Sequence, residues 1–125
     1  MGASFQGAGV CFRQSSDGKL HTAGVASAAT SPFYQIASLK YTSPTAFSAA
    51  YAAIPYATFA GVLWLRIADD GANRICSVSM DGQHWLAFHT VGRTDFLTAD
   101  EVGVWINDQT NTYAPQTAWW SWAEA

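Results

Sequence analysis

The clearest pattern along the chain is an alternation of apolar and polar positions on both sides of two Asp-Gly dipeptides. Three segments belong to this pattern: Val62–Ala68, Asn73–Ser79 and Trp85–Thr90. Asp-Gly suits the positive φ values of a type I′ hairpin turn, so Asp70-Gly71 and Asp81-Gly82 each predict a reversal between antiparallel strands. The three segments are therefore predicted to form a three-stranded meander.

Alternation within the first of these segments assigns its side chains to two faces of the sheet. Leu63, Leu65 and Ile67 point one way, and we expect this aliphatic set to enter the core. Arg66 marks the opposite, wetter face, which it shares with Trp64. Trp64 is then either half exposed or covered by a second layer.

Further strands are expected elsewhere in the chain, at Phe5–Gln14, Lys19–Val25, Gln35–Tyr41, Val102–Asn107 and Thr117–Ala123. A third Asp-Gly dipeptide, Asp17-Gly18, predicts a reversal between the first two. The segment Ala46–Ile54 also fits a helical stripe, and its alanines favour a helix. Flanking prolines leave little room for one, and the neighbouring segments are strands, so we predict a strand at Phe47–Ala53.

Nine short strands at near-regular spacing predict an all-β fold, an antiparallel β-sandwich. No internal repeat, charge run or low-complexity linker divides the chain, so residues 1–125 are expected to form one domain. The length of 125 residues fits a single core. Half of the residues are hydrophobic and 12% are charged, which argues against disorder.

Charge and targeting patterns narrow the classes of partner. The formal net charge is −3 and the six basic residues are scattered, so there is no basic stripe for nucleic acid. The first twenty residues lack the positively charged start followed by an apolar run that marks a secretory signal peptide, and they contain Arg13, Asp17 and Lys19 instead. The apolar stretches are shorter than the ~20 residues of a membrane-spanning helix. We expect a protein made in the cytoplasm, with no signal peptide, no membrane insertion and no nucleic-acid partner.

Residues for catalysis or metal binding are sparse. Glycoside hydrolysis needs two facing carboxyl groups, but Glu101 and Glu124 are the only glutamates, and the aspartates lie mostly in predicted turns. His84 and His89 would face opposite sides of one predicted strand, and His21 is remote in sequence, so a zinc site is not expected. We therefore predict no catalytic residues, no metal and no cofactor.

The two cysteines, Cys11 and Cys76, fall in different predicted strands. One disulfide between them is conceivable, but two cysteines are too few to indicate a disulfide framework. The favoured interpretation is a pair of small buried thiols.

Tryptophan is the unusual component of this chain, at Trp64, Trp85, Trp105, Trp119, Trp120 and Trp122. Indole faces stack on the apolar surfaces of sugar rings and also anchor protein interfaces. Most of the six are expected to fill the core, and the candidates for exposure are Trp64, Trp105 and one side of the terminal cluster. The candidate contacts to a glycan or a protein partner are Trp64, Trp105, Asn107, Asp108, Asn111, Trp120 and Trp122.

Three stretches, residues 65–71, 79–85 and 96–104, resemble concanavalin A-like jelly-roll domains. The kinds they resemble are the non-catalytic domain of some β-xylosidases and the sandwich domains of tailed-phage structural proteins. The resemblance implies a jelly-roll sandwich. Catalytic members of this fold have a strand motif with Glu, Asp and Glu close together, and no such motif occurs here, so the resemblance also implies no enzymatic activity.

Domains of this kind have several strands before the one that would match Val10–Arg13. The resemblance therefore implies a sandwich that is incomplete at its N-terminal side, with an edge or an apolar face for another subunit to cover. The first hypothesis for function is a non-enzymatic virion protein of a bacteriophage, such as a capsid decoration, tail or fibre subunit, whose partners are virion subunits or its own copies. The alternative is a carbohydrate-binding module that holds surface polysaccharide through exposed tryptophans.

Overall fold

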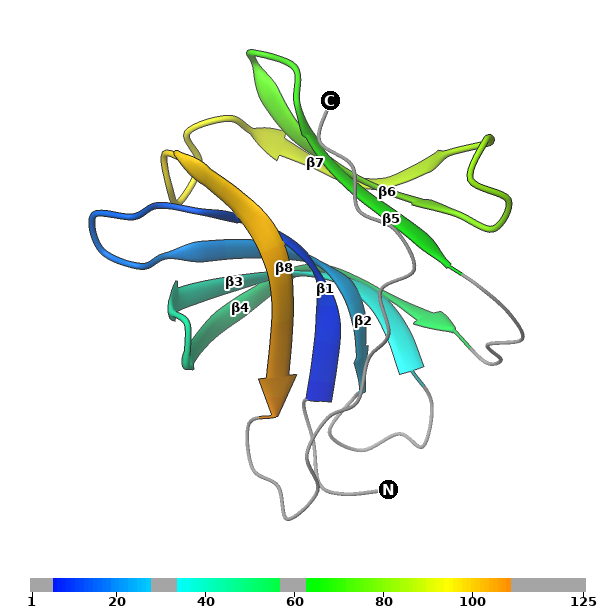
Figure 1. Ribbon diagram of the computed structural model, residues 1–125, viewed down its shortest axis with the longest axis horizontal. Helices are drawn as coiled ribbons and strands as arrows, with labels where there is room; N and C mark the ends of the chain where they lie inside the picture. The colour runs from blue at the N-terminus through cyan, green and yellow to red at the C-terminus, as the bar shows by residue number, and fades with distance from the viewer. Residues whose placement is uncertain (1–5, 28–33, 57–62, 109–125) are drawn as a thin grey trace.

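Two antiparallel sheets packed against each other make up the regular structure of this chain (Figure 1). The computed structural model describes residues 6–27, 34–56 and 63–108. The strands are β1 (Gln6–Arg13), β2 (Leu20–Ser27), β3 (Tyr34–Ser43), β4 (Ala46–Tyr56), β5 (Trp64–Asp69), β6 (Asn73–Ser79), β7 (Leu86–Gly92) and β8 (Glu101–Asp108). One sheet has five strands in the order β4-β3-β2-β1-β8, and the other has three in the order β5-β6-β7.

The expected all-β fold and the three-stranded meander are confirmed. The segment that was ambiguous between helix and strand is strand β4, and the predicted strand at Thr117–Ala123 lies outside the described residues. The arrangement is consistent with an antiparallel β-sandwich, whereas the jelly-roll order of strands is not confirmed. In the part of the chain that the structure describes, no helix is long and apolar enough to span a bilayer.

Glycine residues make the three predicted reversals, but the turn type differs from the expectation. Gly18, Gly71 and Gly82 have φ values of 79°, 93° and 76°. A type I′ turn also needs positive φ at the residue before the glycine, and among the described residues Phe96 is the only non-glycine with positive φ. The prediction of type I′ turns is therefore wrong. The aspartates instead accept hydrogen bonds from the loop backbone, as Asp70 Oδ1 does from the N–H groups of Ala72 and Asn73, at 2.9 and 2.6 Å.

At the centre of the five-stranded sheet both faces are buried, as strand β2 shows. All but one of its eight residues are buried, because β2 is the central strand and is covered on both sides. We call the face that packs on the three-stranded sheet the inner face, and the opposite one the outer face. On the inner face, Val10 and Ala23 pack with Cys76 of β6, and Leu65 and Ile67 of β5 pack against them. The predicted direction of Leu65 and Ile67 toward the core is thus confirmed.

The outer face holds a separate apolar cluster, which we call the outer-face cluster. Its members are Cys11, Leu20, Ala26, Ala37, Leu39, Tyr41 and Trp105. The rings of Tyr41 on β3 and Trp105 on β8 have centroids 5.5 Å apart, although β2 and β1 lie between their strands. Three strand spacings in a flat sheet would be roughly 14 Å. The sheet is therefore strongly curled, as Figure 1 shows for β1, β2 and β8.

Glycines on the outer face allow this curl and bury Trp105. A Cβ atom on Gly7 would lie 2.5 Å from the Trp105 ring, and one on Gly9 would lie 2.2 Å from the carbonyl oxygen of Ala23. The indole thus rests on bare backbone and is only 6% exposed. The expectation that Trp105 is exposed is wrong, because strand alternation cannot show that the outer face is closed by its own curvature.

Candidate functional site

The outward side of the three-stranded sheet has an exposed aromatic surface, which we call the aromatic platform: Trp64, Arg66 and Trp85. Trp64 is 37% exposed, and its indole lies on Gly82, where a Cβ atom would be 3.0 Å from the ring. The guanidinium carbon of Arg66 lies 4.3 Å from the centre of the Trp85 ring, a cation–π contact. The predicted exposure of Trp64 and of Arg66 is confirmed.

The hairpin beneath the platform is held by one carboxylate. Asp81 accepts hydrogen bonds from the backbone N–H groups of Gln83 and His84, each at 2.8 Å, and from Ser79 Oγ at 3.0 Å. The His84 ring lies 2.7 Å from the same carboxylate. The backbone N–H of His84, its ring and the N–H of Gln83 together lower the pKa of Asp81. His84 precedes β7 and so lies outside the strand in which it was predicted.

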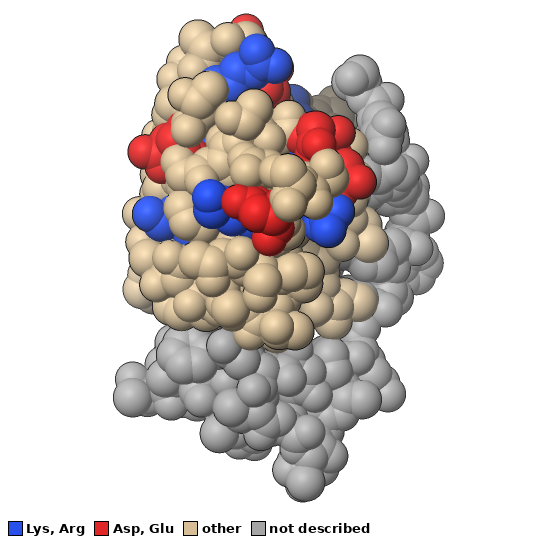
Figure 2. Space-filling view, turned by 90° about the vertical axis from the view of Figure 1, so that its left-hand side faces the viewer, with Lys and Arg blue, Asp and Glu red and all other residues tan. Residues whose placement is uncertain are grey.

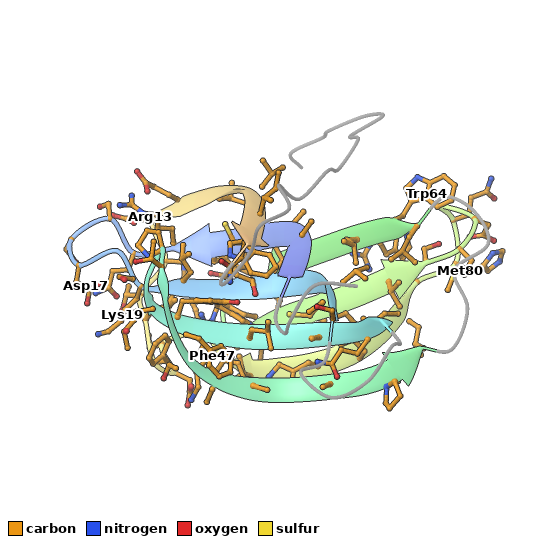
Figure 3. The ribbon with its side chains drawn as sticks, turned by 90° about the horizontal axis from the view of Figure 1, so that it is seen from below. Arg13, Asp17, Lys19, Phe47, Trp64 and Met80 are labelled. Carbon is orange, nitrogen blue, oxygen red and sulfur yellow. The ribbon has the colours of Figure 1, made fainter. Side chains whose placement is uncertain are left out.

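Charged side chains gather at the opposite end of the molecule. Figure 3 places Trp64 and Met80 at one end and Arg13, Asp17 and Lys19 at the other. Figure 2 shows acidic and basic residues intermixed over that second end. Two ion pairs account for part of the mixture, Arg13 with Glu101 and Lys19 with Asp17. Charges of both signs in alternation do not make a surface for a strongly charged partner.

Strand β8 has a row of exposed aliphatic side chains, which we call the β8 row: Val102, Val104 and Ile106. They are 42%, 49% and 47% exposed. Val104 pairs with Val10 of β1, so the row lies on the inner face, beside the inter-sheet core. The row is exposed because β8 is the last strand of its sheet. Next to it is a groove of about 640 Å³, lined by Cys11, Arg13, Leu20, Pro44, Trp105 and residues 101–104 and 106.

The other predicted contact residues do not form one site. Asn107 donates a hydrogen bond of 3.3 Å to the Tyr41 hydroxyl and so belongs to the edge of the outer-face cluster. Asp108 is the last residue of β8 and pairs with Gln6. Asn111, Trp120 and Trp122 lie outside the described residues. The structure therefore places Trp64 on the opposite sheet from Trp105 and Asn107, and does not bring these three together.

Sequence reasoning missed a polar group of side chains between the sheets, which we call the inter-sheet polar cluster: His21, Ser38, Tyr51, Arg74, Cys76 and His89. His21 Nε2 lies 2.7 Å from Ser38 Oγ and 3.5 Å from Cys76 Sγ. The Tyr51 and His89 rings are stacked, with centroids 4.9 Å apart. His21 was set aside as remote from the other histidines, but its ring centroid is 6.1 Å from that of His89.

Two side chains of this cluster, the buried Arg74 and the half-buried Tyr51, approach the same residue, Asp95. Arg74 has no exposed surface and donates from Nη2 to the Asp95 carbonyl oxygen, while the Tyr51 hydroxyl donates to the Asp95 carboxylate. Burial and this hydrogen bond raise the pKa of Tyr51 to about 12. Tyr51 is therefore a neutral donor at physiological pH.

Burial also fixes the protonation states of the other members. Desolvation, followed by the charge of Arg74, lowers the pKa of His21 to about 3, and desolvation raises the pKa of Cys76 to about 11. At neutral pH the pair is a neutral imidazole and a thiol, whereas a catalytic cysteine needs its thiolate. Within the described ranges, no three His, Cys, Asp or Glu side chains are placed to hold a metal ion.

The two cysteines are free and buried, which confirms the favoured interpretation. Cys11 belongs to the outer-face cluster and Cys76 to the inter-sheet core. The five-stranded sheet lies between the two thiols, so a disulfide joining them would require the sheet to open.

Comparison of the chain with protein families, with curated proteins and with solved structures finds no match.

Proposed function

We propose that this chain is a non-enzymatic structural subunit that acts by assembling with other protein subunits. The observation behind the proposal is the β8 row, three aliphatic side chains in line on a strand at the end of a sheet. A contiguous apolar row beside unpaired backbone groups is a template for another chain, and proteins that act alone usually blunt such edges.

The setting that we propose is a bacteriophage virion, as a capsid decoration, tail or fibre subunit. This part rests on the resemblance of residues 65–71, 79–85 and 96–104 to sandwich domains of tailed-phage structural proteins. We propose that the chain also has the jelly-roll topology of those domains. Virions are built from repeated copies of small domains, so an edge that pairs with another subunit would serve such a setting. The inter-sheet polar cluster, with its protonated thiol and neutral imidazole, supports a non-enzymatic role.

Sedimentation of the purified protein over a wide concentration range tests this proposal. We expect mass to rise with concentration, because the β8 row would be covered in the associated state. A protein that remained monomeric, folded and soluble at the highest concentrations would overturn the proposal.

Carbohydrate binding is a second candidate function, favoured by the aromatic platform. Trp64 and Trp85 offer indole surface on the outward side of the small sheet, and Arg66 supplies hydrogen-bond donors beside it. Such surfaces stack on the apolar faces of sugar rings. Screening on a glycan array, followed by Trp64→Ala, tests this function. Binding that is lost with Trp64→Ala but kept with Leu86→Ala, a change at another exposed apolar residue, would support it. No binding to any glycan by the folded protein would exclude it.

A further inference from the structure

Strand β8 differs from the other strand edges in having no register shift, no proline and no charged residue between its first and last positions. Strand β4, at the far side of the same sheet, has three register shifts against β3 and contains Pro55, which has no N–H to donate. Strand β7 has a register shift against β6. The β5 edge is short and has the charged residues Arg66 and Asp69. Bulges, prolines, charges and short length are the usual means of protecting an edge.

Strand β8, by contrast, is long and regular. It pairs with β1 over eight consecutive residues, from Glu101 to Asp108, without a register shift, and it contains no proline. Among the described strands none lies on its other side, so no strand of the described residues pairs with its outward N–H and C=O groups. The backbone of β8 is therefore regular enough for a further strand to continue the sheet.

The spacing of the β8 row is symmetric about its central member. If two β8 strands run antiparallel with Val104 opposite Val104, then Val102 of each copy lies opposite Ile106 of the other. Shifting the pairing by two residues in either direction leaves one aliphatic side chain of each copy without an apolar neighbour opposite. The symmetric register also sets Glu101 of each copy opposite Asn107 of the other, so the two Glu101 residues do not face each other. Asp108 lies opposite Asp100, at the end of the paired segment and outside the aliphatic row.

We propose that two copies of this chain pair through antiparallel β8 strands, with a twofold axis at Val104. This inference rests on the proposed assembly function and identifies its partner as a second copy. The two five-stranded sheets become one continuous sheet, and the inner faces of both copies lie on the same side because opposed residues share a face. The six aliphatic side chains of the two rows then meet across the axis and are withdrawn from water together.

Disulfide trapping with single cysteine substitutions tests the register. Residues opposite each other in antiparallel strands have Cβ atoms about 4.5–5.5 Å apart, close to the separation that a disulfide spans. We expect Val104→Cys to form a covalent dimer under mild oxidation. Val102→Cys and Ile106→Cys should each remain uncrosslinked alone, and should crosslink when the two variants are mixed. The unsubstituted protein is the control for its own buried thiols, Cys11 and Cys76.

Charge substitution tests the β8 pairing without disulfide formation. In Val104→Lys, two ammonium groups would meet on the axis, and we expect the dimer dissociation constant to rise by at least about 100-fold. Leu86→Lys is the matched control, because Leu86 is also exposed and aliphatic but belongs to β7. It should leave the constant nearly unchanged. Circular dichroism of both variants should match that of the unsubstituted protein.

The possible failures are distinguishable. A protein that associates but gives no Val104→Cys crosslink, or that crosslinks through Val102→Cys alone, overturns the twofold pairing and leaves the assembly function standing. Association that survives Val104→Lys does the same. A folded protein that is monomeric at every concentration overturns both the pairing and the assembly function.

Discussion

The two faces of the five-stranded sheet are built on the same strands but bury different chemistry. The outer face holds the outer-face cluster, in which Trp105 and Tyr41 meet over glycine backbone. Part of the inner face holds the inter-sheet polar cluster, in which His21 and Ser38 lie against the polar and sulfur groups of the small sheet. The outer face is thus covered by aromatic packing on glycine backbone, whereas this part of the inner face is held by hydrogen bonds.

Hydrogen-bond satisfaction differs between the two faces. Within the described part of the chain, four buried nitrogens of the inter-sheet polar cluster have no partner, and two buried atoms of the outer face, Thr22 Oγ1 and Trp105 Nε1, have none. Burying a polar group without a partner destabilises the folded state, whereas burying apolar surface stabilises it. We conclude that the outer face supplies more of the stability, and that the inner polar contacts fix how the two sheets align.

The largest expected effect comes from filling the glycine backbone of the outer face. In Gly9→Ala the new Cβ would lie 2.2 Å from the Ala23 carbonyl oxygen, a backbone atom that cannot move aside as the end of a flexible side chain could. We expect a loss of more than about 4 kcal/mol in the free energy of unfolding, or no folding. Gly103→Ala is the matched control, because nothing lies within 4 Å of its added methyl group. Urea denaturation followed by circular dichroism measures both, and equal losses would contradict the role of the close approach.

Removing the indole of the outer face is expected to have the next largest effect. Trp105→Ala should lower the free energy of unfolding by roughly 3–5 kcal/mol, because it empties a buried aromatic site. Trp64→Ala removes the same side chain from an exposed position and should cost less than half as much. Denaturant titrations of the two variants provide the comparison. A larger loss from Trp64→Ala would show that the small sheet, and not the outer face, dominates stability.

The inner face should make stability depend on pH. The pKa of His21 is about 3 in the folded protein and about 6.5 when unfolded, so the unfolded chain binds the extra proton between these values. Stability is therefore full above pH 6.5 and falls as the pH decreases, by up to about 1.4 kcal/mol per pH unit. Burial also lowers the pKa of His89, which adds in the same direction.

Denaturant titrations between pH 6.5 and 4.5 measure this slope above the range in which the carboxylates titrate. His21→Gln should flatten it, while His84→Gln, a change at an exposed histidine, should retain it. A slope unchanged in His21→Gln would contradict the assignment to the buried imidazole.

The smallest effect is expected from replacing the buried cation. Arg74→Met keeps much of the side-chain volume and removes two nitrogens that lack partners, at the expense of the hydrogen bond to the Asp95 carbonyl. The free energy of unfolding should change by less than about 1.5 kcal/mol in either direction. A loss of about 3 kcal/mol or more in the same denaturation assay would mean that hydrogen bonds in solution offset the cost of burying the guanidinium. The two faces would then differ less in their contributions to the free energy of unfolding.

Sequence patterning predicted the local elements well and the exposure of side chains less well. The meander of β5, β6 and β7 followed from alternation and Asp-Gly reversals, and its inward residues Leu65 and Ile67 were identified correctly. Trp105 was misassigned because its face of β8 also has Glu101 and Asn107, residues typical of an exposed face, whereas the opposite face has the aliphatic β8 row. Alternation places Trp105 opposite to the β8 row but does not say which of the two faces is covered.

The inter-sheet polar cluster could not have been assembled from sequence. Alternation does place His21 on the same face as Ala23, a core position, which is the one local indication that its imidazole is buried. Its neighbours Cys76 and His89 belong to the other sheet, and their distance from His21 depends on how the sheets stack.

The sequence by itself determined the strands, their reversals and the sets of residues that share a face, because these depend on backbone periodicity and on the conformational freedom of glycine. Tertiary structure alone decided which faces are covered. The five-stranded sheet curls onto Trp105, and the three-stranded sheet is too narrow to reach the β8 row. Trp105 on one face of β8 is therefore buried and the β8 row on the other face is exposed as consequences of curvature and sheet width, which arise from packing over the whole molecule.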